Sequence, residues 1–162
     1  METVLDSSAP TTTIEFPRFG LCTYAETEVL SFPWGLPGFM NLRRFLVLTV
    51  PGQESFTWLQ SLDDVQIAMP MCDPWALFED YEAPLPHYAK QSLELENPDD
   101  FCIMCVCVVG KGAEEMTINL LAPVVINLKS RVGRQITLEN QKYSIRTPIP
   151  RIAPTPQEVA AS

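Results

Sequence analysis

Histidine is nearly absent from this chain of 162 residues, in which His87 is the only one. It lies among prolines, in a segment that reads as an exposed loop, and a catalytic triad would need a nucleophile beside it. The seven glycines form no Gly-x-Ser-x-Gly elbow, no Gly-x-x-x-x-Gly-Lys loop and no Gly-x-Gly-x-x-Gly fingerprint. The adjacent acids Asp63 and Asp64 point apart on a strand or turn. We therefore predict that the protein is not an enzyme and binds no cofactor.

Basic charge is also scarce, with 11 basic residues against 20 acidic ones and a net charge of −9. Nucleic-acid affinity comes largely from cations placed on phosphates, so an RNA or DNA partner is disfavoured. The acidic runs have two interpretations. They are either solvated loops that keep the protein soluble, or the face that meets a basic protein partner, whose encounter they would accelerate.

Long apolar runs are missing as well. No window reaches the roughly 18 consecutive apolar residues of a membrane helix, and the N-terminus carries Glu2 and Asp6 instead of the basic start of a secretory signal. The five cysteines are an odd number without the spacing of a small secreted domain. These features predict reduced thiols and a cytoplasmic location.

Three of the cysteines, Cys102, Cys105 and Cys107, share one apolar run and raise the alternative of a metal or redox site. On a strand, residues three apart point to opposite faces, so Cys102 and Cys105 diverge. Cys105 and Cys107 share a face at roughly 6.5–7 Å, at or beyond disulfide reach. Cys22 and Cys72 are isolated in the sequence. We predict packing cysteines and no metal site.

Alternation of apolar and polar residues with period two dominates the chain and predicts about nine short strands. A run that is apolar throughout, 45–50, is expected to be buried on both faces. Pro70 and Pro123 are expected to mark sheet edges or bulges, and Gly133 to supply the positive φ of a hairpin turn. The predicted strands are residues 11–16, 28–32, 45–50, 56–61, 67–72, 101–109, 117–128, 135–138 and 143–146.

Prolines interrupt this pattern between residues 73 and 98, where we expect short helical turns starting at Asp73-Pro74 and Asn97-Pro98. Gly110 and Gly112 are expected to turn the chain. The resulting fold class is mainly all-β: a compact antiparallel barrel-like fold with a few short helices. The predicted organisation is a flexible N-terminus over 1–10, a single domain over 11–147 and a disordered proline-rich tail over 148–162.

Three segments of uncommon sequence stand in a fixed order within this domain. The first runs from Gly35 through residues 36–48, the second covers 56–64 and reaches Asp73-Pro74, and the third covers 116–127, followed by Gly133, Gln135 and Tyr143. In this order they resemble the flagellar assembly factor FliW family over about residues 10–147. Pro70, Met71, the cysteine-rich strand and the tail after Thr147 depart from the family pattern.

The resemblance implies a protein-binding regulator of flagellum assembly. FliW-family proteins bind the translational repressor CsrA and antagonise its binding to flagellin mRNA. They also bind flagellin, which couples flagellin synthesis to export. The alternatives are a dedicated flagellin chaperone without a CsrA role, or a cysteine-based metal or redox module. The chain is expected to be a monomer when free.

The residues that would contact CsrA are predicted from charge and position. Acids that flank the irregular segment suit a basic partner, and exposed aromatic neighbours suit an anchoring role. The motif residues such as Gly35 and Trp58 are read chiefly as builders of the turn and the core. The predicted partner-binding residues are Asp63, Asp64, Phe78, Glu79, Asp80, Tyr81 and Glu82.

Overall fold

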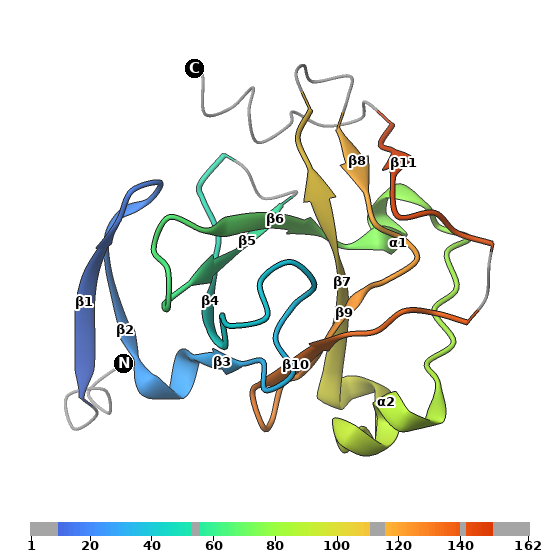
Figure 1. The fold of residues 1–162 in the computed structure, drawn as a ribbon, viewed down its shortest axis with the longest axis horizontal. Helices are drawn as coiled ribbons and strands as arrows, with labels where there is room; N and C mark the ends of the chain where they lie inside the picture. The colour runs from blue at the N-terminus through green and yellow to red at the C-terminus, as the bar shows by residue number, and fades with distance from the viewer. Residues whose placement is uncertain (1–9, 53–55, 111–115, 140–141, 151–162) are drawn as a thin grey trace.

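The computed structural model describes residues 10–52, 56–110, 116–139 and 142–150, and Figure 1 shows a barrel with a hairpin beside it. Short strands dominate, as the period-two alternation predicts. The strands are β1 (Thr11–Phe16), β2 (Gly20–Ala25), β3 (Leu30–Ser31), β4 (Arg44–Leu48), β5 (Thr57–Ser61), β6 (Ala68–Cys72), β7 (Phe101–Val108), β8 (Thr117–Ile118), β9 (Val124–Asn127), β10 (Val132–Gln135) and β11 (Thr147–Pro148). The helices are η2 (Glu26–Glu28), α1 (Pro74–Leu77), α2 (His87–Ser92) and η3 (Pro98–Asp100).

Seven strands close into the barrel in the order β7, β6, β5, β4, β3, β10, β9, with β9 paired back to β7. The mainly all-β, barrel-like prediction is confirmed, with one difference: β3 and β10 pair in parallel. Three seams are thin, because β3 and β10 share one residue pair, whereas β3 and β4 share two and β6 and β7 share two. Strands β8 and β11 extend the sheet beyond the closed part.

The hairpin β1–β2 forms a sheet of its own beside the barrel (Figure 1). Its second strand is absent from the sequence prediction, although Leu21, Thr23 and Ala25 alternate with Cys22 and Tyr24. The hairpin is fixed by Phe16 and Tyr24, which are buried with Val29 and Leu46. Its loop carries Arg18 and Phe19 to the barrel surface, where Phe19 meets the Trp58 ring edge-on at 5.6 Å.

The barrel interior is filled by side chains from strands and from the β3–β4 loop. Phe32 and Phe45 stack edge to face at 5.2 Å, and both are fully buried. Gly133 lies against this pair, because a Cβ at that position would lie 2.6 Å from the Phe32 ring. The predicted role of Gly133 is therefore wrong: the positive φ of the turn before β10 belongs to Arg131, at 62°.

Other expected strands differ in extent. The expected strand over 117–128 is two strands, and pairing with β7 shifts by three residues between β8 and β9, so a bulge surrounds Pro123. Val47 is 40% exposed, so β4 is not buried on both faces. β3 and β10 occupy 30–31 and 132–135 instead of the expected 28–32 and 135–138, and no strand forms over 143–146.

The proline-rich segment folds as expected into short helices. Asp73 caps α1, since its carboxylate accepts a hydrogen bond from the Trp75 N–H at 2.9 Å and Pro74 occupies the first turn. Asn97 and Pro98 start η3 in the same positions, without a side-chain cap.

Most of the ends expected to be flexible or disordered lie outside the described residues, as does the turn expected at Gly112. Pro148 pairs with Thr117, and the Ile149 N–H donates to the Met116 carbonyl at 3.1 Å, so ordered chain continues to that point.

Candidate functional site

The predicted binding residues fall into two groups at opposite ends of β6. Asp63 and Asp64 lie in the turn before this strand, and residues 78–82 follow the helix α1 after it. The strand has five residues and therefore spans about 16 Å. The structure does not bring the two groups into one patch.

Asp63 and Asp64 are exposed, and both hold backbone in place. The Asp63 carboxylate accepts the N–H groups of Arg43 and Arg44 at 2.6 and 3.0 Å, which ties the β5–β6 turn to the start of β4. Asp64 accepts the Gln66 N–H at 3.0 Å. These contacts give both acids a structural role. The sequence does not reveal that of Asp63, because its partners are backbone groups of another segment, whereas Asp64 bonds within its own turn.

Residues 78–82 form a surface with aromatic support. Glu79, Asp80 and Glu82 are exposed and Phe78 is half-buried. Tyr81, predicted to be an exposed anchor, is only 4% exposed, and its hydroxyl donates to the Leu120 carbonyl at 2.7 Å. Burial is the main cause that raises the pKa of Tyr81. This tyrosine is therefore not exposed as expected, and it anchors the segment to the barrel.

Trp75 is the exposed aromatic of this surface, at 39%, and the sequence prediction does not include it. Its ring meets Tyr81 edge-on at 5.3 Å, and its indole N–H donates to the Tyr81 carbonyl at 2.7 Å. The Glu82 N–H donates to the Tyr143 hydroxyl at 2.8 Å. Rigid aromatics and acids thus lie together, and we call Trp75, Glu79, Asp80 and Glu82 the α1 surface. The sequence did contain a signal for Trp75. It directly follows the capped helix start Asp73-Pro74, a position at which the side chain is exposed.

A second exposed aromatic group lies around Arg134 of β10. Its guanidinium lies 4.3 Å from the Trp34 ring and 5.0 Å from the Tyr88 ring, and it donates to the Ser92 hydroxyl at 2.9 Å. Trp34 and Tyr88 are 37% and 45% exposed. Three elements distant in sequence meet here, so no local pattern predicts the group.

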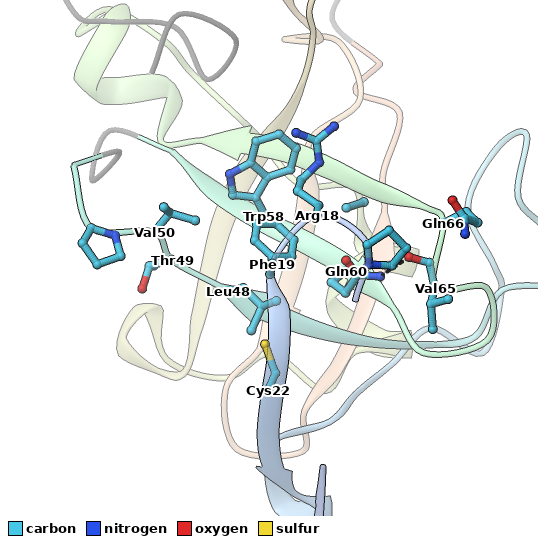
Figure 2. Close-up of a pocket in the computed structure, with 13 residues that line it drawn as sticks. Arg18, Phe19, Cys22, Leu48, Thr49, Val50, Trp58, Gln60, Val65 and Gln66 are labelled. Atoms are coloured by element: carbon cyan, nitrogen blue, oxygen red, sulfur yellow. Dashed lines mark hydrogen bonds between the residues drawn. The ribbon is translucent and has the colours of Figure 1, made fainter. Parts of the chain in front are cut away.

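A cavity with a volume of about 850 Å³ lies along Trp58. Figure 2 shows Trp58 with Arg18 and Phe19 of the hairpin at the centre, and Gln60 and Val65 to one side. The Arg18 guanidinium lies 4.5 Å above the Trp58 ring. A second cavity, of about 510 Å³, shares Arg18, Trp58 and Ala68 with the first and extends between β6 and β7. We call the two together the Trp58 cleft.

The cysteines lie where strand geometry predicts, with one correction. Cys102 packs with the barrel interior, whereas Cys105 and Cys107 pack on the other side of β7. Cys72 is not isolated, because its Sγ lies 3.1 Å from that of Cys107. Burial raises the pKa of Cys105 to about 12, and the Cys72 thiol together with burial raises the pKa of Cys107. Thiols held neutral in this way are poor nucleophiles.

Within the described ranges, no three histidine, cysteine, aspartate or glutamate side chains are grouped so that they could hold a metal ion. His87 is exposed at the first position of α2. The described residues also contain no helix long and apolar enough to cross a membrane.

The fold and these surfaces define the class of a small closed β-barrel with a flanking hairpin. The same architecture occurs in a solved structure, the crystal structure of the flagellar assembly factor FliW. It matches with a TM-score of 0.78 at 26% identity and covers 85% of this chain and 96% of that one.

Sequence comparison names the family. The family model for the FliW protein matches residues 13–149. The flagellar assembly factor FliW of Clostridium tetani is 34% identical over 80% of this chain and 90% of its own length. That of Pseudothermotoga lettingae is 38% identical over 80% of this chain and 83% of its own length. The chain belongs to the FliW family of flagellar assembly factors.

Proposed function

We propose that this chain is a non-enzymatic regulator that binds CsrA, antagonises the binding of CsrA to flagellin mRNA, and also binds flagellin. Membership of a family of flagellar assembly factors is the observation that carries the proposal. Flagellin and CsrA then compete for one protein, so free flagellin would release CsrA to repress translation. This coupling acts through the concentration of unoccupied protein, and it needs no catalytic group. The proposed setting is the cytoplasm, with a free monomer and no direct contact to nucleic acid or membrane.

The α1 surface supports contact with a basic partner. Its three exposed acids follow, within seven residues of the chain, an exposed tryptophan that is fixed by an edge contact and a hydrogen bond to Tyr81. Tryptophan is enriched among residues that dominate binding energy, and a fixed side chain loses little entropy on binding. We therefore retain Phe78, Glu79, Asp80 and Glu82 from the predicted set, add Trp75, and assign Tyr81 to support.

Calorimetric titration of the full chain into the CsrA of the same bacterium tests the function. It is performed with and without flagellin-leader RNA bound to CsrA. Saturable binding that displaces the RNA is expected. Binding to flagellin without binding to CsrA would instead identify a dedicated chaperone, and stoichiometric zinc in the purified protein would favour the metal or redox alternative.

A pair of variants tests the α1 surface. Asp80→Lys with Glu82→Lys is expected to weaken CsrA binding by roughly tenfold or more, because charge reversal replaces attraction with repulsion. The matched control, Glu96→Lys with Asp99→Lys, changes the net charge equally on an exposed segment outside this surface. Equal losses in both variants, or none in either, would remove the α1 surface from the CsrA interface.

A further inference from the structure

The sheet opens between β6 and β7 at a definite position. The strands pair at Met71 with Val106 and at Cys72 with Cys105, and in the described chain the pairing goes no further. The next residues in register are Pro70 and Cys107. Beyond this point β7 continues beside β8, to which it pairs through Cys107 and Val108 (Figure 1).

Proline chemistry explains the opening. In an antiparallel ladder, successive residues direct their N–H and C=O groups to alternate sides. The Asn119 N–H donates to the Val106 carbonyl at 3.0 Å, so Val106 faces β8 and its neighbour Cys107 faces β6. The residue opposite Cys107 is Pro70, whose ring nitrogen has no hydrogen for the Cys107 carbonyl. The ladder therefore ends there.

The edge of β6 beyond Pro70 is left open as well. The Ser61 N–H donates to the Ile67 carbonyl at 2.9 Å, so Ile67 faces β5. Alternation then directs the N–H and C=O of Ala68 away from β5. Among the described residues, no backbone hydrogen bond from another strand reaches this side of Ala68. An open edge of this kind is a template for a further strand.

The open edges line the part of the Trp58 cleft that lies between β6 and β7. Its walls include Pro70, Cys107, Trp58 and the exposed Ile145, around a volume of about 510 Å³. The lining is mainly apolar, and such a cleft is suited to side chains that an added strand would direct inward.

Charge identifies the kind of segment that fits. Arg18 and Arg146 both line this part of the cleft and are exposed, in a protein with a net charge of −9. Neither guanidinium has a carboxylate partner among the described residues, although acids outnumber bases in the chain. Arg18 is instead held over the Trp58 ring, with its hydrogen-bond donors still available. Guanidinium groups in this position select a carboxylate.

We propose that the Trp58 cleft binds an extended segment of a partner protein that adds as a strand at the β6–β7 opening. The segment has apolar residues at alternate positions and carboxylates that meet Arg18 and Arg146. This site is separate from the α1 surface and has the opposite charge preference. This proposal rests neither on the family assignment nor on CsrA binding. Its test therefore uses no CsrA, so the two proposals can fail separately.

Selection from a random library of displayed twelve-residue peptides on the immobilised full chain tests the chemistry. Enriched peptides are expected to combine acidic residues with alternating apolar ones. Their affinities are then measured by fluorescence anisotropy. Arg18→Glu and Arg146→Glu are each expected to weaken binding by about five- to tenfold. The matched control Lys90→Glu, at an exposed position on α2, is expected to bind normally.

Backbone methylation of the selected peptide tests the added strand. Methyl groups on one set of alternate amides are expected to abolish binding, and those on the other set to be tolerated, since only one edge of the peptide faces the barrel. Equal effects of both sets would overturn strand addition. Enrichment of basic peptides, no enrichment at all, or equal affinity of the arginine variants and Lys90→Glu would overturn the charge assignment.

A second copy of the chain is the competing occupant. Light scattering after size exclusion, over a range of concentrations, is expected to show a monomer. A concentration-dependent dimer that Arg18→Glu disrupts would assign the cleft to self-association and overturn the proposal of a separate partner.

Discussion

At the scale of single residues, the uncommon motif around Gly35 builds the fold. Gly35 has a φ of 69°, which side chains with a Cβ rarely adopt, and an added Cβ would lie 2.6 Å from the Met40 carbonyl oxygen. Leu36 and Phe39 bridge across the same loop, and Leu36 is buried in the barrel interior. The motif is therefore conspicuous because the loop has to close tightly over the core.

Gly35→Ala is expected to lower the free energy of unfolding by about 2 kcal/mol or more, since strained φ and backbone overlap add together. Gly38→Ala is the matched control in the same loop, because Gly38 has a φ of 85° but nothing within 4 Å of its added Cβ. We expect it to lose only about 1 kcal/mol. Urea unfolding measures both, and equal losses would show that the Met40 contact contributes nothing.

Cys105 makes stability depend on alkaline pH. Burial raises its pKa to about 12 from the ordinary value of 9.0, so the unfolded chain releases this proton first as the pH rises. The unfolded state is then favoured, and stability falls between about pH 9 and 12 by at most about 1.4 kcal/mol per pH unit for this group. Below pH 9 this contribution is constant.

Urea unfolding of wild type and Cys105→Ala at several pH values between 8 and 10.5 measures this dependence. The variant will be less stable at every pH because of the cavity, but its stability should fall less steeply above pH 9. Parallel curves would mean that Cys105 does not contribute to the alkaline loss.

At the scale of elements, prolines and hydrogen-bond donors decide where strands end. Pro17 follows β1, Pro74 starts α1, and Pro123 lies in the bulge between β8 and β9. Pro70 has the largest consequence, because it lies within a strand and ends the ladder on one side only. The sequence predicts an edge or a bulge at Pro70. The structure has an edge there on one side only, because β6 remains paired to β5 at this position.

Pro70→Val is expected to extend the β6–β7 ladder, because valine supplies the N–H that faces the Cys107 carbonyl. The free energy of unfolding should change by less than about 1 kcal/mol, since the new hydrogen bond and the loss of proline rigidity offset each other. Hydrogen exchange measured by NMR is the readout. The new amide at position 70 should exchange as slowly as is expected for the paired Met71 amide, and fast exchange would show that the strands separate for another reason.

At the scale of the whole molecule, charge of opposite sign lies on different surfaces. The α1 surface carries three exposed acids, whereas the Trp58 cleft is lined by Arg18 and Arg146. The total charge of −9 acts on every partner, but the local sign decides which segment can dock. A protein with two such surfaces is suited to partners of different chemistry.

Association with CsrA is expected to depend strongly on salt. Raising the ionic strength from about 50 to 500 mM shortens the screening length, so the association rate should fall roughly tenfold while the dissociation rate changes little. Stopped-flow fluorescence of Trp75 or of labelled CsrA measures both rates. An association rate independent of salt would show that the acidic surface does not steer the encounter.

The sequence predicted the fold class well, whereas the exposure and contacts of individual side chains were predicted only in part. Strands with clear alternation, such as Thr11–Phe16, were located correctly, and so was the capped start at Asp73. The strand Gly20–Ala25 was missed, and Tyr81 was placed on the surface although its hydroxyl is bonded inside the protein. The partner of Tyr81, the Leu120 carbonyl, comes from a distant segment, so a local pattern contains no signal for its burial. The strand Gly20–Ala25 does show local alternation and pairs with its neighbour in the chain, Thr11–Phe16.

Sequence alone determined the mainly β character and the family resemblance, because alternation, turn residues and motif order are local properties of the chain. Tertiary structure alone decided the rest. It placed Trp75 outside and Tyr81 inside, brought Cys72 to Cys107, and assigned Asp63 to a backbone contact. It also decided that the missing N–H of Pro70 leaves an open strand edge, in a cleft that Arg18 and Arg146 line. The sequence could not show this, because only barrel closure fixes which strand lies opposite that proline.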